Sequence, residues 1–222
     1  MFRFCICIAL LIFNSCATAT PETEKNFESK SLTEESSALS QEVLEEPPVD
    51  IWERIRTSLT IKIPEDQIAA TSVYRERLYK NQSAVNRISK SGQRYLYHTL
   101  TRAEELGLPV ELALLPFVES EFDPYAKSVD GATGIWQFMP ATGKEWGLKS
   151  NWWYDGKKDV LASTEAAFQF LTYLNEKFDG DWLLAMAAYN TGPTRVNRAI
   201  RKNKRLEKGI RFWDLNLPKE TT

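Results

Sequence analysis

Cysteine and histidine are almost absent from this chain of 222 residues, which contains three Cys and a single His. The cysteines are Cys5, Cys7 and Cys16, so the chain beyond residue 16 can form no disulfide and offers no thiol. This excludes thiol proteases and cysteine-based metal clusters for the main part of the protein. The one histidine, His98, has no second metal ligand at a suitable spacing, and we therefore expect neither a metal nor another cofactor.

Near the N-terminus the apolar run is short. It extends from Phe4 to Phe13, whereas a membrane-spanning helix needs about 20 residues. Because Arg3 precedes this run and small or polar residues follow it, residues 1–19 have the layout of a secretory signal. Two processing routes compete: "FNSC" favours a lipoprotein signal with an acylated Cys16, and "ATA" over 17–19 favours ordinary cleavage. We expect a protein of the bacterial cell envelope, in the periplasm, attached to a membrane in the first case.

Charge of either sign is nearly balanced, with a formal net charge of −2, but it is unevenly placed. Residues 21–50 hold nine acids against Lys25 and Lys30, so the chain from residue 51 onward is mildly basic. That excess is too small for a nucleic-acid partner, which would require clustered Lys and Arg, but it suits an acidic or mixed-charge polymer. The stretch 20–50 is rich in Glu and Ser and poor in aromatics, which predicts a disordered acidic tether.

Alternating strand-like runs are scarce after residue 50, where apolar residues recur at helical spacing. Helices are predicted over 163–178 and over 181–193, the second capped by Asp181 and ended by Gly192-Pro193. The predicted fold class is mainly α. We expect a helical extension over 51–90, followed by a second helical part over 91–222.

Three carboxylates, those of Glu119, Glu121 and Asp123, lie within "FVESEFDP". We expect a helix over 109–122 that begins at Pro109 and bends near Pro116. On such a helix Glu119 shares a face with buried leucines, and burial raises the pKa of a carboxyl so that it can act as a general acid. Glu121 also shares a face with apolar residues, so periodicity alone leaves both glutamates open.

Three longer segments decide between them: "VESEFDPYAKSVDGATGIWQFMPATG" (118–143), "NWWYDGKKDVLAS" (151–163) and "DGDWLLAMAAYNTGPTRVNRAI" (179–200). In order and spacing they resemble the lysozyme-like (goose-type lysozyme/SLT) helical domain of the lytic transglycosylases. The resemblance extends from about residue 51 to 222. In that family the acid immediately before the Ser is the catalyst, which implies Glu119 and not Glu121.

The resemblance implies cleavage of peptidoglycan glycan strands between N-acetylmuramic acid and N-acetylglucosamine, with formation of 1,6-anhydromuramoyl ends. One carboxylate is sufficient, because the substrate's own C6 hydroxyl supplies the nucleophile, whereas most glycosidases use two carboxylates. Two alternatives stay open: a hydrolytic lysozyme-type muramidase on the same scaffold, and a catalytically weak wall-binding protein.

The resemblance also implies roles for residues around the acid. Gln137 and Met139 are expected to line the sugar groove, although Met139 could instead fill the core. Ser128 and Gly134 match the loop that approaches the acid, where a hydroxyl could orient an acetamido group and Gly permits close backbone approach.

Tyr189 and Asn190 end the "AAYN" helix, where the Tyr hydroxyl could hold Glu119 or simply close the core. Residues 152–154 are aromatic and could stack on sugars or fill the core. The resemblance ends at Glu220-Thr221, before a closing helical segment that carries a supporting Tyr in relatives, and no LysM repeat follows. The resemblance thus implies a catalytic domain over 91–222, and three interpretations of its C-terminus stay open: a short natural form, a truncated gene product or a fragment.

Overall fold

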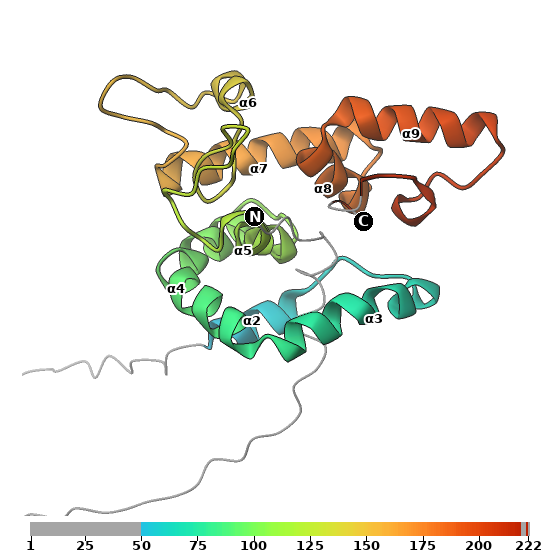
Figure 1. Cartoon of the computed structure of the whole chain (residues 1–222), viewed down its shortest axis with the longest axis horizontal. Coiled ribbons are helices and arrows are strands. Elements are labelled where there is room, and N and C mark those ends of the chain that lie inside the picture. The colour runs from blue at the N-terminus through green and yellow to red at the C-terminus, as the bar shows by residue number, and fades with distance from the viewer. Residues whose placement is uncertain (1–49, 219–220, 222) are drawn as a thin grey trace, which may run out of the picture.

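The computed structural model describes residues 50–218 and 221. The predicted signal, over 1–19, and the predicted tether, apart from Asp50, lie outside the described residues. Within the described part, the mainly α prediction is confirmed, and β pairing is limited to three isolated bridges. The elements, shown in Figure 1, are α2 (Ile51–Ser58), α3 (Glu65–Lys80), α4 (Gln82–Glu105), η1 (Val110–Leu114), α5 (Leu115–Ser120), α6 (Pro140–Glu145), α7 (Val160–Lys177), α8 (Trp182–Thr191), α9 (Pro193–Arg205) and η2 (Phe212–Asp214), where η marks a 3-10 helix.

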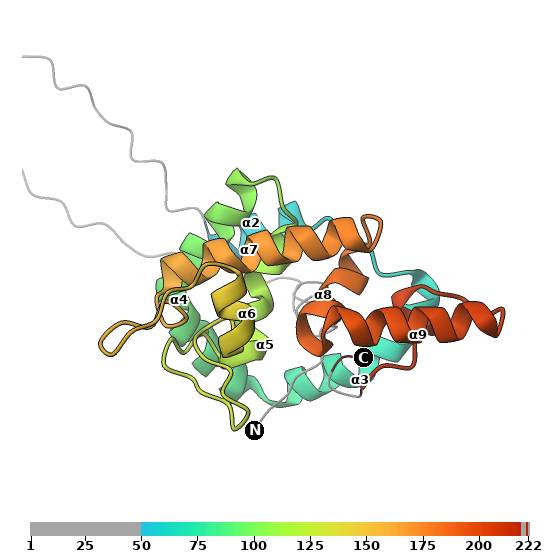
Figure 2. The ribbon, with the colours of Figure 1, turned by 90° about the horizontal axis from the view of Figure 1, so that it is seen from above.

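The core forms where α4, η1, α5, α7 and α8 meet, with α5 near the centre of the molecule (Figure 1). Leu100 on α4, Leu112 on η1, Leu171 on α7 and Ala188 on α8 are all completely buried there. Burying apolar side chains from several helices together is the main force that holds such a fold. The view from above in Figure 2 shows α7 crossing the molecule and α9 lying beyond α8.

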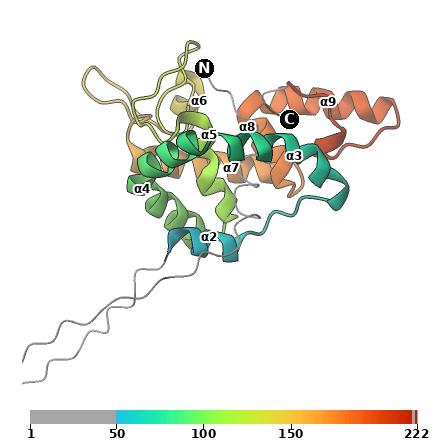
Figure 3. The ribbon, with the colours of Figure 1, turned by 60° about the horizontal axis from the view of Figure 1, so that its bottom comes forward.

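The N-terminal helix α2 packs against η1, at the opposite end of the molecule from α6 (Figure 3). Its Asp50 cap accepts a hydrogen bond from the Trp52 N–H at 3.0 Å. Ile55 is fully buried, and Arg54 forms an ion pair with Glu104 on α4. These contacts fix the start of the described chain to the body of the protein.

One expected helix, over 109–122, is two elements in the structure. The 3-10 helix η1 ends at Leu114, and α5 then runs from Leu115 to Ser120 with Pro116 in its first turn. The first turn of a helix leaves its N–H groups unpaired, so a proline, which has no N–H, is tolerated there. Pro116 therefore starts α5 and does not bend a longer helix. The expectation of one continuous helix with a bend is therefore corrected.

Helices α7 and α8 match the predictions over 163–178 and 181–193 closely. The Asp159 carboxylate accepts the Ala162 N–H at 3.0 Å at the start of α7. The Asp181 carboxylate accepts the Leu184 N–H at 3.0 Å at the start of α8. Gly192, with φ of 88°, ends α8 and directly precedes α9. Across residues 50–218 and 221, no helix is both long and apolar enough to cross a bilayer.

Candidate active site

Glu119 lies near the C-terminal end of α5 and is half-buried. Its helical neighbour Leu115, four residues earlier, is only 1% exposed, so the backbone that carries the carboxylate is set into the core. The Ser120 hydroxyl donates to the carbonyl oxygen of Ile135 at 2.8 Å. This bond ties the end of α5 to the loop over 126–138.

Tyr189 comes from the last turns of α8, and its hydroxyl donates to the carbonyl oxygen of Trp136 at 2.8 Å. Burial raises the pKa of Tyr189 well above its ordinary value, and the charge of Glu119 raises it further. The hydroxyl is therefore within electrostatic reach of Glu119 and stays protonated. The Tyr189 hydroxyl therefore donates its hydrogen bond to the loop backbone. A hydrogen bond to Glu119 was one of the two roles that the sequence suggested for it.

The loop over 126–138 is braced by its own polar groups. The Gln137 amide nitrogen donates to the carbonyl oxygens of Gly134 at 2.9 Å and Ala126 at 3.3 Å. The Ser128 hydroxyl oxygen accepts the Ala132 N–H at 3.0 Å. The loop is thus a defined scaffold beside Glu119, and the amide of Gln137 and the hydroxyl of Ser128 take part in building it.

Gly134 is the residue where this loop requires glycine. Its φ is 82°, and a β-carbon on it would overlap the backbone carbonyl of Lys157. A positive φ is strained for residues with a side chain, and here there is also no space for one. The glycine at 134 therefore allows the backbone of the loop over 126–138 to pack directly against the backbone at Lys157.

The remaining predicted residues lie at the surface. Met139 caps the start of α6 and is 42% exposed, so it does not fill the core. Asn190 is exposed, and its side-chain oxygen accepts the Thr221 hydroxyl at 2.9 Å. Trp152 and Trp153 are exposed on a loop, which removes core filling as their role.

The two glutamates that periodicity left open are separated by the end of α5. Glu121 follows the last residue of α5 and has a φ of 54°, in the left-handed region. Its side chain therefore does not continue the helical face that carries Glu119. It pairs with Arg87, with Arg87 Nε 3.2 Å from a carboxylate oxygen. Arg87 is largely exposed and Glu121 is partly exposed, and a surface ion pair of this kind contributes little to stability.

A buried carboxylate that the sequence did not single out is Glu111 in η1, which is completely buried. It accepts the backbone N–H groups of Thr60 and Ile61, each at 2.6 Å, and so fastens the segment after α2. The signal was present as a lone acid within the apolar run over 110–118. Around His98, whose Nε2 is buried without a hydrogen-bond partner, and elsewhere in the described residues, no group of three or more possible metal ligands gathers.

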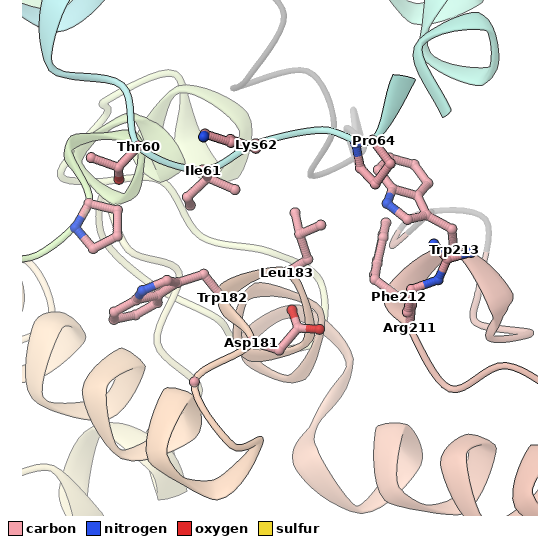
Figure 4. A pocket seen from close by; sticks show the side chains of 12 residues that line it. Thr60, Ile61, Lys62, Pro64, Asp181, Trp182, Leu183, Arg211, Phe212 and Trp213 are labelled. Carbon is pink, nitrogen blue, oxygen red and sulfur yellow. The ribbon is translucent and has the colours of Figure 1, made fainter. Parts of the chain in front are cut away.

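A cavity of about 360 Å³, shown in Figure 4, is lined neither by Glu119 nor by any other predicted site residue. It is lined by the segment over 60–64, by the start of α8 and by η2, and Asp181, Trp182 and Trp213 border it. The start of α8 is seven residues from Tyr189, roughly 10 Å along the helix axis. The cavity and Tyr189 therefore lie at opposite ends of α8.

A half-buried acid at a helix end, a Tyr hydroxyl whose pKa is raised by burial and by the charge of that acid, and a braced loop with an obligatory Gly define a candidate glycosidase-type site. The family model for the transglycosylase SLT domain matches residues 90–212, and the chain belongs to this family.

Among curated relatives, membrane-bound lytic murein transglycosylase D of Escherichia coli strain K12 is 42% identical over 175 residues, covering 79% of this chain and 38% of that protein. Soluble lytic murein transglycosylase of Salmonella typhimurium is 30% identical over 108 residues, covering 46% of this chain and 16% of its own length. The chain thus spans well under half of these relatives. A solved structure of the lytic transglycosylase Slt from Pseudomonas aeruginosa is 30% identical, with a TM-score of 0.38, over 49% of this chain and 18% of that one.

Proposed function

We propose that this protein is a peptidoglycan lytic transglycosylase. It cleaves the β-1,4 bond between N-acetylmuramic acid and N-acetylglucosamine and leaves 1,6-anhydromuramoyl ends, in turnover and remodelling of the cell wall. The observation that carries the proposal is Glu119, half-buried near the end of α5 and within electrostatic reach of the Tyr189 hydroxyl, within the SLT domain.

In the proposed reaction Glu119 acts first as an acid and then as a base. Its carboxyl proton moves to the oxygen that joins the two sugars, and the bond from that oxygen to muramoyl C1 breaks. The muramoyl C6 hydroxyl attacks C1, and its proton passes to the Glu119 carboxylate. One C–O bond breaks and one forms, no water is consumed, and Glu119 ends protonated as it began.

The surroundings of Glu119 support a mechanism with one carboxylate. Glu121 is paired with Arg87, and Asp155 is paired with Lys157 at 2.6 Å. One Asp123 oxygen accepts the Tyr125 N–H at 2.8 Å. These acids have structural bonds of their own, and an intramolecular nucleophile needs no second acid to activate water.

Other predicted residues take binding roles in this proposal. Met139, exposed at the start of α6, would pack on a sugar face. The Gln137 amide oxygen and the Ser128 hydroxyl would hydrogen-bond hydroxyl or acetamido groups, since the amide nitrogen of Gln137 already braces the loop. Gly134 lets backbone approach closely, and Asn190 lies at the exposed end of α8.

The proposed location is the cell envelope. The E. coli relative is named as membrane-bound, which supports this assignment. Within it, the signal in residues 1–19 is a lipoprotein signal that ends before Cys16, Cys16 is acylated, and 20–50 tether the helical domain to the membrane so that it can reach glycan strands. Metabolic labelling with a fatty acid tests the anchor: label on the protein that is lost in Cys16→Ser supports it, and an unlabelled mature chain beginning at Thr20 refutes it.

Mass analysis of purified peptidoglycan after digestion tests the function. A lytic transglycosylase yields muropeptides with anhydro ends, and a hydrolytic muramidase yields reducing ends. Binding without any cleavage would instead favour a wall-binding protein. Glu119→Gln serves as the matched control, because it has nearly the same shape and cannot donate a proton.

A further inference from the structure

Trp152 and Trp153 are 93% and 71% exposed, at the tip of the loop between α6 and α7. This loop projects from the helices in both Figure 1 and Figure 2. Tyr125, on the loop after α5, is 75% exposed. Large exposed aromatics grouped on neighbouring loops are unusual in a soluble domain and typically mark a binding surface. We call Tyr125, Trp152 and Trp153 the aromatic platform.

The Trp-bearing loop is held in a fixed shape. The Asn151 side-chain oxygen accepts the N–H groups of Trp153 at 3.0 Å and Tyr154 at 2.8 Å. The Asn151 N–H donates to the Tyr154 carbonyl at 2.7 Å, and the Ser150 hydroxyl donates to Asp155 at 2.9 Å. Because the backbone of this loop is already ordered, binding of a ligand to these rings costs less conformational entropy of the loop.

The base of the loop is attached to the scaffold beside Glu119. The carbonyl of Lys157 lies against Gly134, so closely that no side chain fits between them. The Lys158 amine stands over the Tyr125 ring, 5.9 Å from its centroid, and so joins the two loops of the platform. The platform is therefore continuous with the loop that bears Gln137.

We propose that the aromatic platform is an additional binding surface for the glycan strand of peptidoglycan, outside the catalytic centre, where the rings stack on the apolar faces of N-acetylated sugars. This inference rests on the proposed function. A glycan fits better than an anionic membrane, which would require free clustered cations. The loop between α6 and α7 carries three lysines, fewer than the clusters of about four to eight cations that recruit anionic lipids. Of these, Lys157 is paired with Asp155, and Lys158 stands over Tyr125.

The test uses the full chain carrying Glu119→Gln, so that binding to insoluble peptidoglycan is measured by sedimentation without cleavage. Adding Trp152→Ala and Trp153→Ala together should weaken binding roughly tenfold, because both exposed stacking rings are removed. Adding Tyr79→Ala instead should leave binding unchanged, because Tyr79 is comparably exposed, at 70%, but lies on α3. Circular dichroism should be the same for all three.

With Glu119 intact, the double Trp variant should raise KM on peptidoglycan roughly tenfold and keep kcat within about twofold. If the parent binds peptidoglycan and the double variant binds equally well, the inference is overturned while the proposed function stands. Loss of binding to phosphatidylglycerol vesicles with unchanged peptidoglycan binding would overturn it in favour of a membrane surface. A parent that neither binds nor cleaves peptidoglycan refutes the proposed function itself.

Discussion

The two ends of α8 have different surroundings. At the C-terminal end, Tyr189 presents a buried hydroxyl whose pKa is raised by burial and by the charge of Glu119. At the N-terminal end, Trp182 and Leu183 border the cavity of about 360 Å³ (Figure 4). The acid there, Asp181, accepts the Leu184 N–H and so caps the helix.

The presence of a cavity therefore does not by itself locate the chemistry of this protein. The cavity is bordered by Asp181, whose carboxylate is committed to a backbone N–H group as the cap of α8. Glu119 instead lies near the end of α5, within electrostatic reach of the Tyr189 hydroxyl, which is held in its neutral form. An acid held in place beside a preorganised polar group is the arrangement that proton transfer needs.

The largest effect should come from Glu119→Gln, which removes the proton donor and keeps the shape. We expect the rate of peptidoglycan cleavage to fall by about 10²–10⁴-fold, the usual contribution of general acid–base catalysis, with an unchanged helical circular-dichroism signal. Glu121→Gln is the matched control, since it loses only a surface ion pair with Arg87. Its stability should change by at most about 1 kcal/mol and most activity should remain. A dead Glu121 variant beside an active Glu119 variant would reverse the assignment.

The next largest effect concerns the loop over 126–138, which is bonded to the end of α5 beside Glu119 through Ser120. Gly134→Ala should lower the free energy of unfolding by more than Gly131→Ala, as measured by urea denaturation. Both positions have a positive φ, of 82° and 90°, but only the β-carbon at 134 meets another group, the carbonyl of Lys157. The positive φ alone should cost about 1–2 kcal/mol in either alanine variant. Any further loss of unfolding free energy in Gly134→Ala therefore measures the clash with the carbonyl of Lys157. Equal losses in the two variants would show that this approach is unimportant.

A smaller loss is expected for Tyr189→Phe, which leaves the carbonyl of Trp136 without its donor. The cost should be about 1–3 kcal/mol of stability, with a roughly tenfold lower cleavage rate. The raised pKa also predicts a pH dependence. Above pH of about 10 the unfolded chain loses the Tyr189 proton while the folded protein keeps it, so the wild type should lose stability as pH rises. Thermal melts in which the Phe variant shows the same alkaline slope would contradict this.

The smallest effect on cleavage should follow a change at the other end of α8. Trp182→Ala enlarges the cavity bordered by Trp182 and removes a partly buried ring. Some stability should be lost, but the cleavage rate at a temperature well below the melting point should stay within about twofold. A rate loss as large as that of the Tyr189 variant would mean that the two ends act together, and the contrast between them would fail.

Much of the fold follows from local sequence rules. Helix α8 was predictable because Asp181 and Gly192 mark its ends, and both act as expected. The division at Pro116 was harder to predict, because a proline that starts a helix and one that bends a helix leave the same pattern of apolar residues. The structure resolves it because η1 ends at Leu114.

The candidate site was predictable in composition and less so in contacts. Periodicity could not separate Glu119 from Glu121, since the positive φ at Glu121 depends on how the chain turns after α5. The bond from Tyr189 to the Trp136 carbonyl joins residues 53 positions apart, and no local rule predicts such a pairing. The exposure of Trp152 and Trp153 was likewise not predictable, because large aromatics usually fill cores.

In the proposed mechanism Glu119 alone provides the proton transfers, and the substrate provides the nucleophile. Digestion of purified peptidoglycan in water enriched with heavy oxygen distinguishes the two possible nucleophiles, with the new muramoyl ends analysed by mass spectrometry. We expect anhydro ends without heavy oxygen from the full chain, and no new ends from Glu119→Gln. Reducing ends that carry heavy oxygen would show that water is the nucleophile and would refute the proposed mechanism.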